Sequence, residues 1–135
     1  MVAQTRRSKY VDAVRTRMAE RCHATNAQLA DDLRKVYPDL SDTTVHRITQ
    51  RLLVDAQLSL APRAECGAKR FDVNTSSHDH FECTTCQQLI DISVSSNFRE
   101  ELQSSLGGCR IGESLTIRGN CQKCLAKKEV NNGTN

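Results

Sequence analysis

Apolar residues recur at helical spacing in three stretches near the start of the chain, at 10–18, 29–36 and 45–52. Each stretch places its apolar side chains on one face, as an amphipathic helix does when it packs against a core. The expected inward residues are Tyr10, Val11, Val14, Met18, Leu29, Leu33, Val36, Val45, Ile48 and Leu52. The pattern therefore predicts three short helices that share one core.

Signals for helix ends support this division. Thr25 and Gln28 stand three residues apart as in a capping box, so the second helix should begin after Thr25. Pro38 lacks a backbone N–H and is expected to end that helix. Ser41 or Asp42 would cap the third helix, whose outward side chains are basic and polar. Three short helices with a basic third one are typical of a helix-turn-helix.

Two short extended segments follow, at 58–60 and 69–73, and the run 62–67 between them is rich in turn-forming residues. This pattern predicts a β-hairpin that would serve as a wing. We therefore expect residues 1–73 to form a winged-helix DNA-binding domain.

The pattern changes after Val73. Alternating apolar residues predict strands at 89–94 and 114–118, and helical spacing predicts a short helix at 97–106 between them. We expect a small α/β domain at 74–128 and a disordered polar tail at 129–135. The fold class of the whole chain would then be α+β.

Charge is distributed unevenly between the two halves. Residues 1–70 hold 13 Lys and Arg against 8 Asp and Glu, whereas residues 71–135 hold 6 against 8. The first half is therefore expected to bind a polyanion. The sequence shows no signal peptide and no apolar run of about 18 residues, so we expect a cytoplasmic protein without a membrane segment. A reducing cytoplasm would keep the seven cysteines as thiols, available to metals.

Two Cys-x-x-Cys pairs bracket the second half of the chain. They are Cys83 with Cys86 and Cys121 with Cys124. Four thiolates in two such pairs can close a tetrahedral structural zinc site. Buried cysteines without metal and a thiol oxidoreductase are the alternatives, but a thioredoxin-like strand-helix-strand pattern precedes neither pair. We therefore expect a structural zinc and no enzymatic activity.

Several motifs, in this order, resemble those of the ferric uptake regulator family. They are Thr44-Val-His-Arg47, Lys69-Arg-Phe-Asp72, His78-Asp-His-Phe-Glu-Cys83, Asp91 and the closing Cys-x-x-Cys. The resemblance runs from about Thr5 to Lys128. It implies a homodimeric, metal-dependent transcriptional repressor that has a winged-helix domain, a dimerisation domain, a structural zinc and a regulatory metal.

The resemblance also implies which residues hold the regulatory metal. The five residues are His23, Asp72, His78, His80 and Asp91. Such a mixed nitrogen and oxygen set suits Fe(II) or Mn(II). The alternative is that His78 and His80 alternate on an exposed strand and that His23 is a solvated loop residue.

An Asp at position 72 resembles the peroxide-sensing (PerR) branch of the family. That resemblance implies that Fe(II) in the regulatory site reacts with hydrogen peroxide, that His23 or His78 gains oxygen, and that DNA is then released. The alternative is an iron-, manganese- or zinc-responsive regulator that reads metal occupancy only. Cys22, Cys66 and Cys109 belong to neither expected metal site. If Cys66 were a ligand of the regulatory metal in place of Asp72, a zinc sensor would be favoured.

The expected DNA contacts lie mainly on the third helix. They are Arg15, Thr43, Thr44, His46, Arg47 and Gln50. Dimer symmetry would require a pseudo-palindromic operator in double-stranded DNA. His46 departs from the family, in which Tyr is common, and the segment before Thr5 is shorter than the family's N-terminal helix. A metal-buffering scaffold whose basic half binds an acidic protein is the alternative to a repressor.

Overall fold

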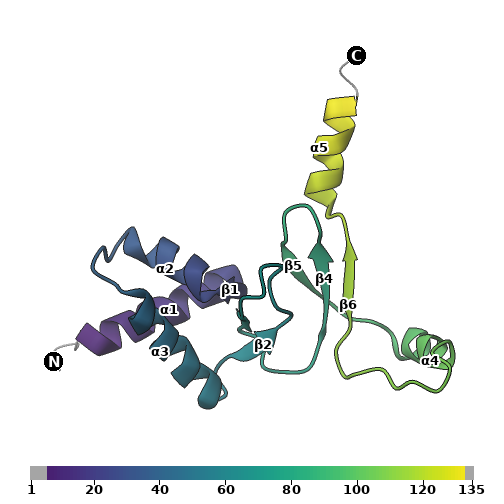
Figure 1. Cartoon of the computed structure of the whole chain (residues 1–135), viewed down its shortest axis with the longest axis horizontal. Coiled ribbons are helices and arrows are strands. Elements are labelled where there is room, and N and C mark those ends of the chain that lie inside the picture. Colours follow the sequence, from purple (N-terminus) through teal and green to yellow (C-terminus); the bar gives the residue numbers. More distant parts are fainter. Residues whose placement is uncertain (1–5, 133–135) are drawn as a thin grey trace. The chain divides into compact units, whose positions relative to one another are not determined.

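The computed structural model describes residues 6–132. The chain divides into two compact units, residues 1–75 and 76–135. Figure 1 shows the elements of both units, which are described separately below. Among the described residues, none of the helices is both long and apolar enough to cross a membrane.

Three helices and a small sheet make up the N-terminal unit. The helices are α1 (Arg6–Arg21), α2 (Asn26–Arg34) and α3 (Asp42–Val54), and the strands are β1 (His23–Thr25), β2 (Ser59–Ala61) and β3 (Arg70–Asp72). All pairings in this sheet are antiparallel, with β3 in the centre. The predicted helix-turn-helix and wing are both confirmed. The strand β1 was not predicted.

The predicted caps are present. The hydroxyl of Thr25 accepts a hydrogen bond from the Gln28 backbone N–H at 3.2 Å, and the Gln28 side chain accepts one from the Thr25 N–H at 3.0 Å. At α3 the capping residue is Ser41, whose hydroxyl accepts from the Thr44 N–H at 3.1 Å. These bonds satisfy N–H groups that the first turn of a helix leaves unpaired.

The core of this unit lies between the three helices and the sheet. It includes Val14, Met18, Leu29, Leu33, Val45, Ile48, Leu52 and Phe71, with Tyr10 and Val11 packed against it. The prediction that Val36 is buried is wrong, since its side chain is 69% exposed. Helix α2 ends at Arg34, and the backbone N–H groups of Val36 and Tyr37 both bond the Leu33 carbonyl. The chain therefore turns away before Val36, and Leu40 fills the core there.

The C-terminal unit contains a three-stranded sheet and two helices. Its elements are β4 (Asp79–Cys83), β5 (Leu89–Ile92), α4 (Ser96–Ser104), β6 (Thr116–Gly119) and α5 (Gln122–Asn132). The strand β4 lies in the centre, antiparallel to β5 and parallel to β6. Three predicted elements are present as β5, α4 and β6. The sequence missed β4 and α5.

Helix α5 corrects the prediction of a disordered tail for residues 129–132. The helix continues to Asn132, and residues 133–135 lie outside the described part. Its first bond runs from the Leu125 N–H to the Cys121 carbonyl. Once the second cysteine pair has started the helix, the good helix formers from Leu125 to Glu129 extend it.

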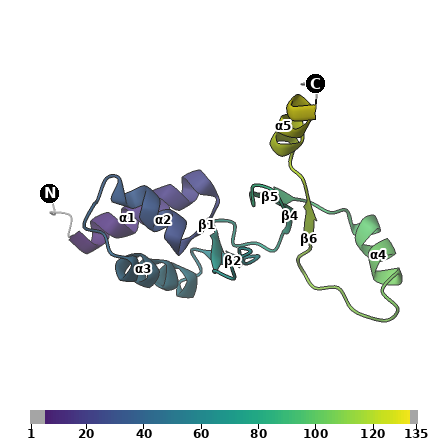
Figure 2. The same cartoon turned by 45° about the horizontal axis from the view of Figure 1, so that its top comes forward.

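Very little apolar surface is buried in the C-terminal unit. Its core cluster consists of Cys83, Cys121 and Cys124, with Phe81 packed against them. Helix α4 contains no buried residue. In Figures 1 and 2, α4 and α5 both lie at the periphery of the sheet. Among the described residues, the buried hydrophobic residues of this unit are therefore Leu89 and three of the cysteines.

Candidate metal centres and DNA-binding surface

The four paired cysteines converge in the C-terminal unit. Their Sγ atoms all lie within 4.8 Å of one another, and the Cys83–Cys124 and Cys86–Cys121 separations are both 3.8 Å. A tetrahedral zinc ion with Zn–S bonds of about 2.3 Å requires sulfur atoms about 3.8 Å apart. A disulfide requires about 2.0 Å. The thiols are therefore placed as a structural zinc site and not as disulfides.

The sheet explains why cysteines far apart in sequence meet. Cys83 ends β4, and its register partner on the parallel strand β6 is Gly119, two residues before Cys121. The backbone N–H groups of Cys86 and Cys121 point at the Cys83 sulfur, at 3.5 and 3.3 Å. These N–H groups lower the pKa of Cys83, because they stabilise the thiolate. Hydrogen bonding by Cys121, together with burial, raises the pKa of Cys124.

The expected ligands of the second metal fall into two sets, one in each unit. In the N-terminal unit, β1 and β3 pair so that His23 lies opposite Asp72. The His23 Nε2 atom lies 3.3 Å from Asp72 Oδ2, and Asp72 is fully buried. The other oxygen, Oδ1, accepts a hydrogen bond from the Asn74 N–H at 2.8 Å. This bond fixes the carboxylate and leaves Oδ2 facing the imidazole.

The C-terminal unit holds the other three. His80 and Asp91 are register partners on β4 and β5. The Nε2 atoms of His78 and His80 lie 3.1 and 3.4 Å from the same oxygen, Asp91 Oδ1. His78 Nδ1 lies 2.7 Å from the Ser76 carbonyl, so it carries the proton and directs the Nε2 lone pair toward Asp91. The two histidines therefore face a common point, as ligands of one ion would.

Asp79 lies between those histidines in sequence but has a structural role. Its carboxylate accepts hydrogen bonds from the N–H groups of Leu115 and Val94, at 2.9 and 3.2 Å, and pairs with the Arg99 guanidinium. Burial alone would raise the pKa of Asp79, but the Leu115 N–H and Arg99 outweigh it and hold the pKa below its ordinary value. Asp79 thus anchors α4 and the segment before β6 to the sheet.

The expected DNA contacts of α3 lie on its outer face. Thr43, His46, Arg47 and Gln50 are exposed, whereas Thr44 is half-buried. The Thr44 hydroxyl lies 2.9 Å from that of Ser41, so Thr44 is part of the helix cap. On α1, Arg15 is exposed and donates to the Gln57 side chain at 2.6 Å.

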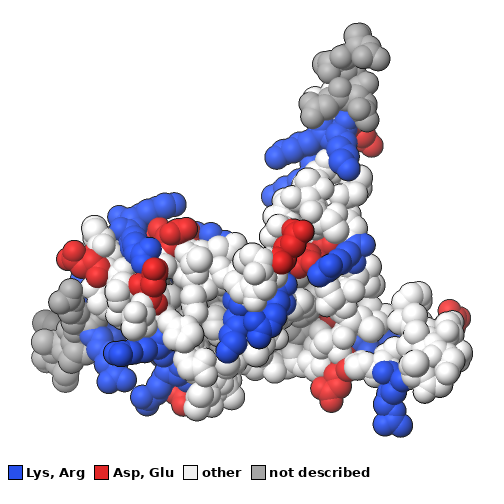
Figure 3. Space-filling model, viewed as in Figure 1, with Lys and Arg blue, Asp and Glu red and all other residues white. Residues whose placement is uncertain are grey.

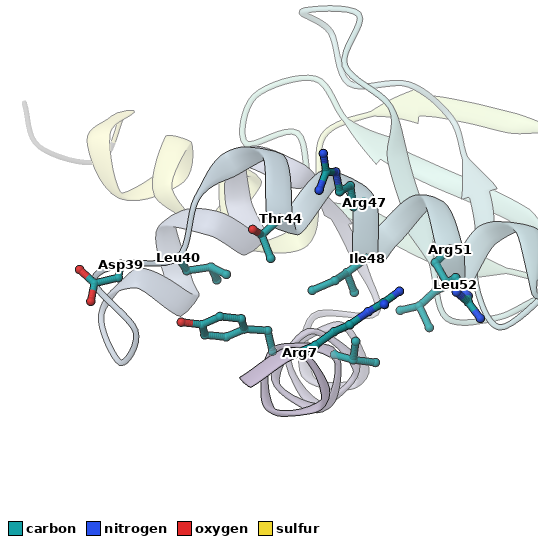
Figure 4. A pocket seen from close by; sticks show the side chains of 10 residues that line it. Arg7, Asp39, Leu40, Thr44, Arg47, Ile48, Arg51 and Leu52 are labelled. Atoms are coloured by element: carbon teal, nitrogen blue, oxygen red, sulfur yellow. The ribbon is translucent and has the colours of Figure 1, made fainter. Parts of the chain in front are cut away.

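The basic surface extends beyond the residues expected from sequence. In Figure 3, Lys and Arg side chains gather along the edge of the N-terminal unit over α1 and α3. A hollow between these helices is lined by Arg7, Arg47 and Arg51. Figure 4 shows Ile48 and Leu52 pointing from α3 toward α1, with Arg7 in the space between the helices. Arg7 lies one helical turn before the inward Val11.

The remaining cysteines take no part in these groups. Cys22, Cys66 and Cys109 are exposed, and within residues 6–132 they belong to neither group of candidate metal ligands. Cys22 has a φ of 67°, and its carbonyl accepts from the Val73 N–H, so its backbone helps to align β1 with β3.

Comparison with known proteins agrees with this architecture. The model of the ferric uptake regulator family matches residues 3–107. No curated protein shows significant similarity to the sequence. Among solved structures, the Helicobacter pylori ferric uptake regulator, described with three functional metal binding sites, is 16% identical with a TM-score of 0.66. The alignment covers 92% of this chain and 83% of that one.

Two further structures share the fold. The ferric uptake regulator from Francisella tularensis with iron is 18% identical, with a TM-score of 0.63 and coverage of 93% of this chain and 95% of that one. The Campylobacter jejuni peroxide stress regulator is 20% identical, with a TM-score of 0.62 and coverage of 87% and 90%. Because the family model spans most of the sequence, the chain belongs to the ferric uptake regulator family of metal-responsive transcription regulators.

Proposed function

We propose that this protein is a homodimeric, metal-dependent repressor that releases its DNA when hydrogen peroxide oxidises a histidine of its regulatory metal site. The main support is the pairing of ligating atoms within each unit. His23 faces Asp72, and His78 and His80 both face Asp91. Buried or half-buried imidazoles that face carboxylates are common around metal ions.

One ion bound by both sets would explain metal-dependent DNA binding. The N-terminal set offers two ligands and the C-terminal set three, so neither set alone completes the coordination shell of Fe(II) or Mn(II). A shared ion would hold the unit that carries α3 at one angle to the other unit. Loss of the ion would free that angle. DNA affinity would then depend on metal occupancy through ordinary linkage between two binding events.

Peroxide sensing follows from iron in such a site. Bound Fe(II) would catalyse cleavage of the O–O bond of hydrogen peroxide, and the histidine ring would supply the two electrons. In the overall reaction, one ring carbon of His23 or His78 exchanges its C–H bond for a bond to oxygen, and the second peroxide oxygen leaves as water. The modified ring loses a ligating nitrogen, so the ligand shell becomes incomplete. The protein is consumed in this reaction and is therefore a sensor, not a turnover enzyme.

The four-cysteine group would hold zinc throughout this cycle. Zn²⁺ is not redox-active, and four thiolates close its coordination shell, so peroxide finds no open position there. None of the seven cysteines, all of which lie within the described residues, forms a disulfide, which agrees with action in a reducing cytoplasm.

Dimerisation is supported by apolar surface on the C-terminal unit. Ile90, Phe81 and Ile117 form one row across the sheet, and both isoleucines are 40% exposed. On α4, Phe98 and the half-buried Leu102 lie one turn apart. A unit of this size with so small a core gains stability by burying such surface against a second copy.

DNA binding is assigned to the N-terminal unit. Its basic surface would contact phosphates, and the exposed face of α3 would contact base edges in the major groove. In a dimer the two copies of α3 would require an inverted repeat. A library of random duplexes incubated with the Mn(II)-loaded protein should therefore yield an inverted repeat, and a chelator should abolish its selection. Failure to select any sequence would favour a scaffold that binds an acidic protein.

Peptide mass mapping tests the sensing chemistry. The Fe(II)-loaded protein is treated with low hydrogen peroxide beside a Mn(II)-loaded control. We expect one added oxygen on the peptide that contains His23 or His78, with iron only. If no oxygen is added and DNA binding persists, the protein is an iron-, manganese- or zinc-responsive regulator that reads occupancy alone.

Substitution of one ligand provides a matched variant. Asp72→Glu retains a carboxylate but moves its oxygens by about one carbon–carbon bond. We expect metal-dependent DNA binding to persist and release by peroxide to weaken. Unchanged release in this variant would contradict the role assigned to Asp72.

A further inference from the structure

A chain of hydrogen bonds runs from the core of the N-terminal unit to the outer face of α3. Thr49 is fully buried, and its hydroxyl lies 2.7 Å from Asn26 Oδ1. The Asn26 Nδ2 atom lies 3.2 Å from His46 Nδ1. Asn26 belongs to α2, whereas His46 and Thr49 belong to α3, so the amide bridges the two helices of the helix-turn-helix.

Hydrogen-bonding rules give this chain a direction. The Thr49 hydroxyl can also reach the carbonyls of His46 and Val45, at 3.1 and 3.2 Å, but Asn26 Oδ1 is nearest. With its oxygen bound to Thr49, the amide presents its N–H₂ group to His46. An amide N–H₂ only donates, so His46 Nδ1 must accept. The proton of the neutral ring is then on Nε2, the atom that does not face Asn26.

We propose that Asn26 is a positioning residue that makes His46 a dedicated hydrogen-bond donor for reading bases in the operator. This inference rests on the proposed DNA-binding function and adds a rule for sequence preference. In the major groove, guanine, adenine and thymine present acceptors, whereas cytosine presents only the N4 amino donor. A donor Nε2–H is compatible with the first three and unpaired against cytosine. Arg47, the next residue, also donates only.

Orientation by Asn26 matters because the Nε2 atom of a free imidazole can act either as a donor or as an acceptor. Without a partner at Nδ1 the ring can rotate and exchange its proton between nitrogens, so Nε2 can donate or accept. Cytosine at the contacted position then becomes acceptable. The discrimination against cytosine that would be lost corresponds to one hydrogen bond, which is about three- to tenfold in affinity.

Selection from random duplexes gives the first test, with full-length protein loaded with Mn(II). The position at which His46→Ala loses its preference identifies the base that His46 contacts. We expect Asn26→Ala to lose discrimination against cytosine at that same position, about three- to tenfold, and to keep its preferences at the other positions. Thr49→Val should have the same effect in weaker form, and Thr49→Ser, which keeps the hydroxyl, should not.

The ring proton can be observed directly. Long-range ¹⁵N–¹H NMR spectra of histidine-labelled protein distinguish the two neutral tautomers. We expect the Nε2–H form for His46 in the original protein and a mixture in Asn26→Ala. An Nδ1–H form would overturn the proposal, as would an Asn26→Ala variant with unchanged preference at the His46 position. If the original protein selects no sequence, the DNA-binding function itself fails, whatever the NMR result.

Discussion

The two units are stabilised by different means. In the N-terminal unit, Val14, Met18, Leu29, Val45 and Phe71 are almost fully buried in one continuous core. In the C-terminal unit, the core cluster consists of three cysteines with the partly buried Phe81 packed against them, and Leu89 is buried outside this cluster. The first unit is held by the hydrophobic effect. We expect the second to depend on the zinc ion that its four cysteines are placed to bind. On this expectation, the N-terminal unit would stay folded without metal, whereas the order of the C-terminal unit would require it.

Removal of the structural zinc should produce the largest difference in stability between the two units. Cys121→Ser leaves three thiolates and lowers zinc affinity, and structural zinc contributes roughly 10 kcal/mol or more in small domains. We expect hydrogen exchange of β4, β5 and β6 to become fast while α1 and α3 stay protected. Cys109→Ser, an exposed cysteine outside the group, is the matched control. Continued protection of β4 in the zinc-free variant would show that the apolar surface suffices.

A cavity in the N-terminal core should have the converse effect. Met18 is fully buried, so Met18→Ala should lower the free energy of unfolding of this unit by about 2–5 kcal/mol. Zinc content should stay unchanged, because the cysteines belong to the other unit. Val36→Ala serves as control, since Val36 is largely exposed. The measurements are urea denaturation followed by helical circular dichroism, and zinc by mass spectrometry.

Acid should weaken the N-terminal unit through one carboxylate. Hydrogen bonds from Arg21 outweigh burial and, with those from Arg17, lower the pKa of Asp32 to about 2. A group whose pKa is lower in the folded state stabilises it above the unfolded pKa, and that stability disappears as pH falls through the folded pKa. We expect the unit to lose about 2 kcal/mol between about pH 4 and about pH 2.

The variant Asp32→Asn tests the source of this loss. It should be less stable than the original protein at pH 6 and should lose less between pH 4 and pH 2. The exposed Asp31 of the same helix gives the control Asp31→Asn, which should keep the original dependence. A pH dependence that persists in Asp32→Asn would assign the acid sensitivity to other groups.

The smallest expected effects lie at two residues in the left-handed region. Ala56, just after α3, has a φ of 58°, and Gln87, after the first cysteine pair, has a φ of 64°. Glycine adopts this conformation without the contact between Cβ and the backbone that strains other residues. Ala56→Gly should stabilise the N-terminal unit by about 1 kcal/mol and Gln87→Gly the C-terminal unit similarly. Ala27→Gly, within α2, should instead destabilise by about 1 kcal/mol.

The sequence predicted elements whose signals are local. Thr25 with Gln28 located the start of α2, and apolar periodicity identified the buried faces of α1 and α3. Prediction from the sequence failed where tertiary contacts determine the secondary structure or the burial of a residue. Only the pairing with Asp72 and its neighbours makes His23–Thr25 a strand, and Leu40 displaces Val36 from the core because the chain turns at Leu33. The strand β4 was missed because His80 and Glu82, polar residues, alternate with Phe81 in the centre of a sheet.

The candidate sites were predictable to different degrees. The spacing of Cys83, Cys86, Cys121 and Cys124 identified the thiol group, because two such pairs are specific for zinc. The histidines required the family resemblance, since isolated histidines carry no such spacing. No sequence signal singled out Asn26, because a polar residue beside the capping box is already expected at the start of a helix. Its contact with His46 crosses 20 positions of sequence and appears only once α2 and α3 pack.

The chain between the two cysteine pairs leaves the sheet and returns to it, with both ends fixed at the sulfur cluster. Asp79 ties this excursion to β4 through Val94, Arg99 and Leu115. Closing a longer loop costs little, about 0.6 kcal/mol for each doubling of its length. The segment around Gly107 and Gly108 should therefore tolerate insertions and diverge quickly in length among relatives. A fluorescent label inserted there should have little effect on the stability of the C-terminal unit.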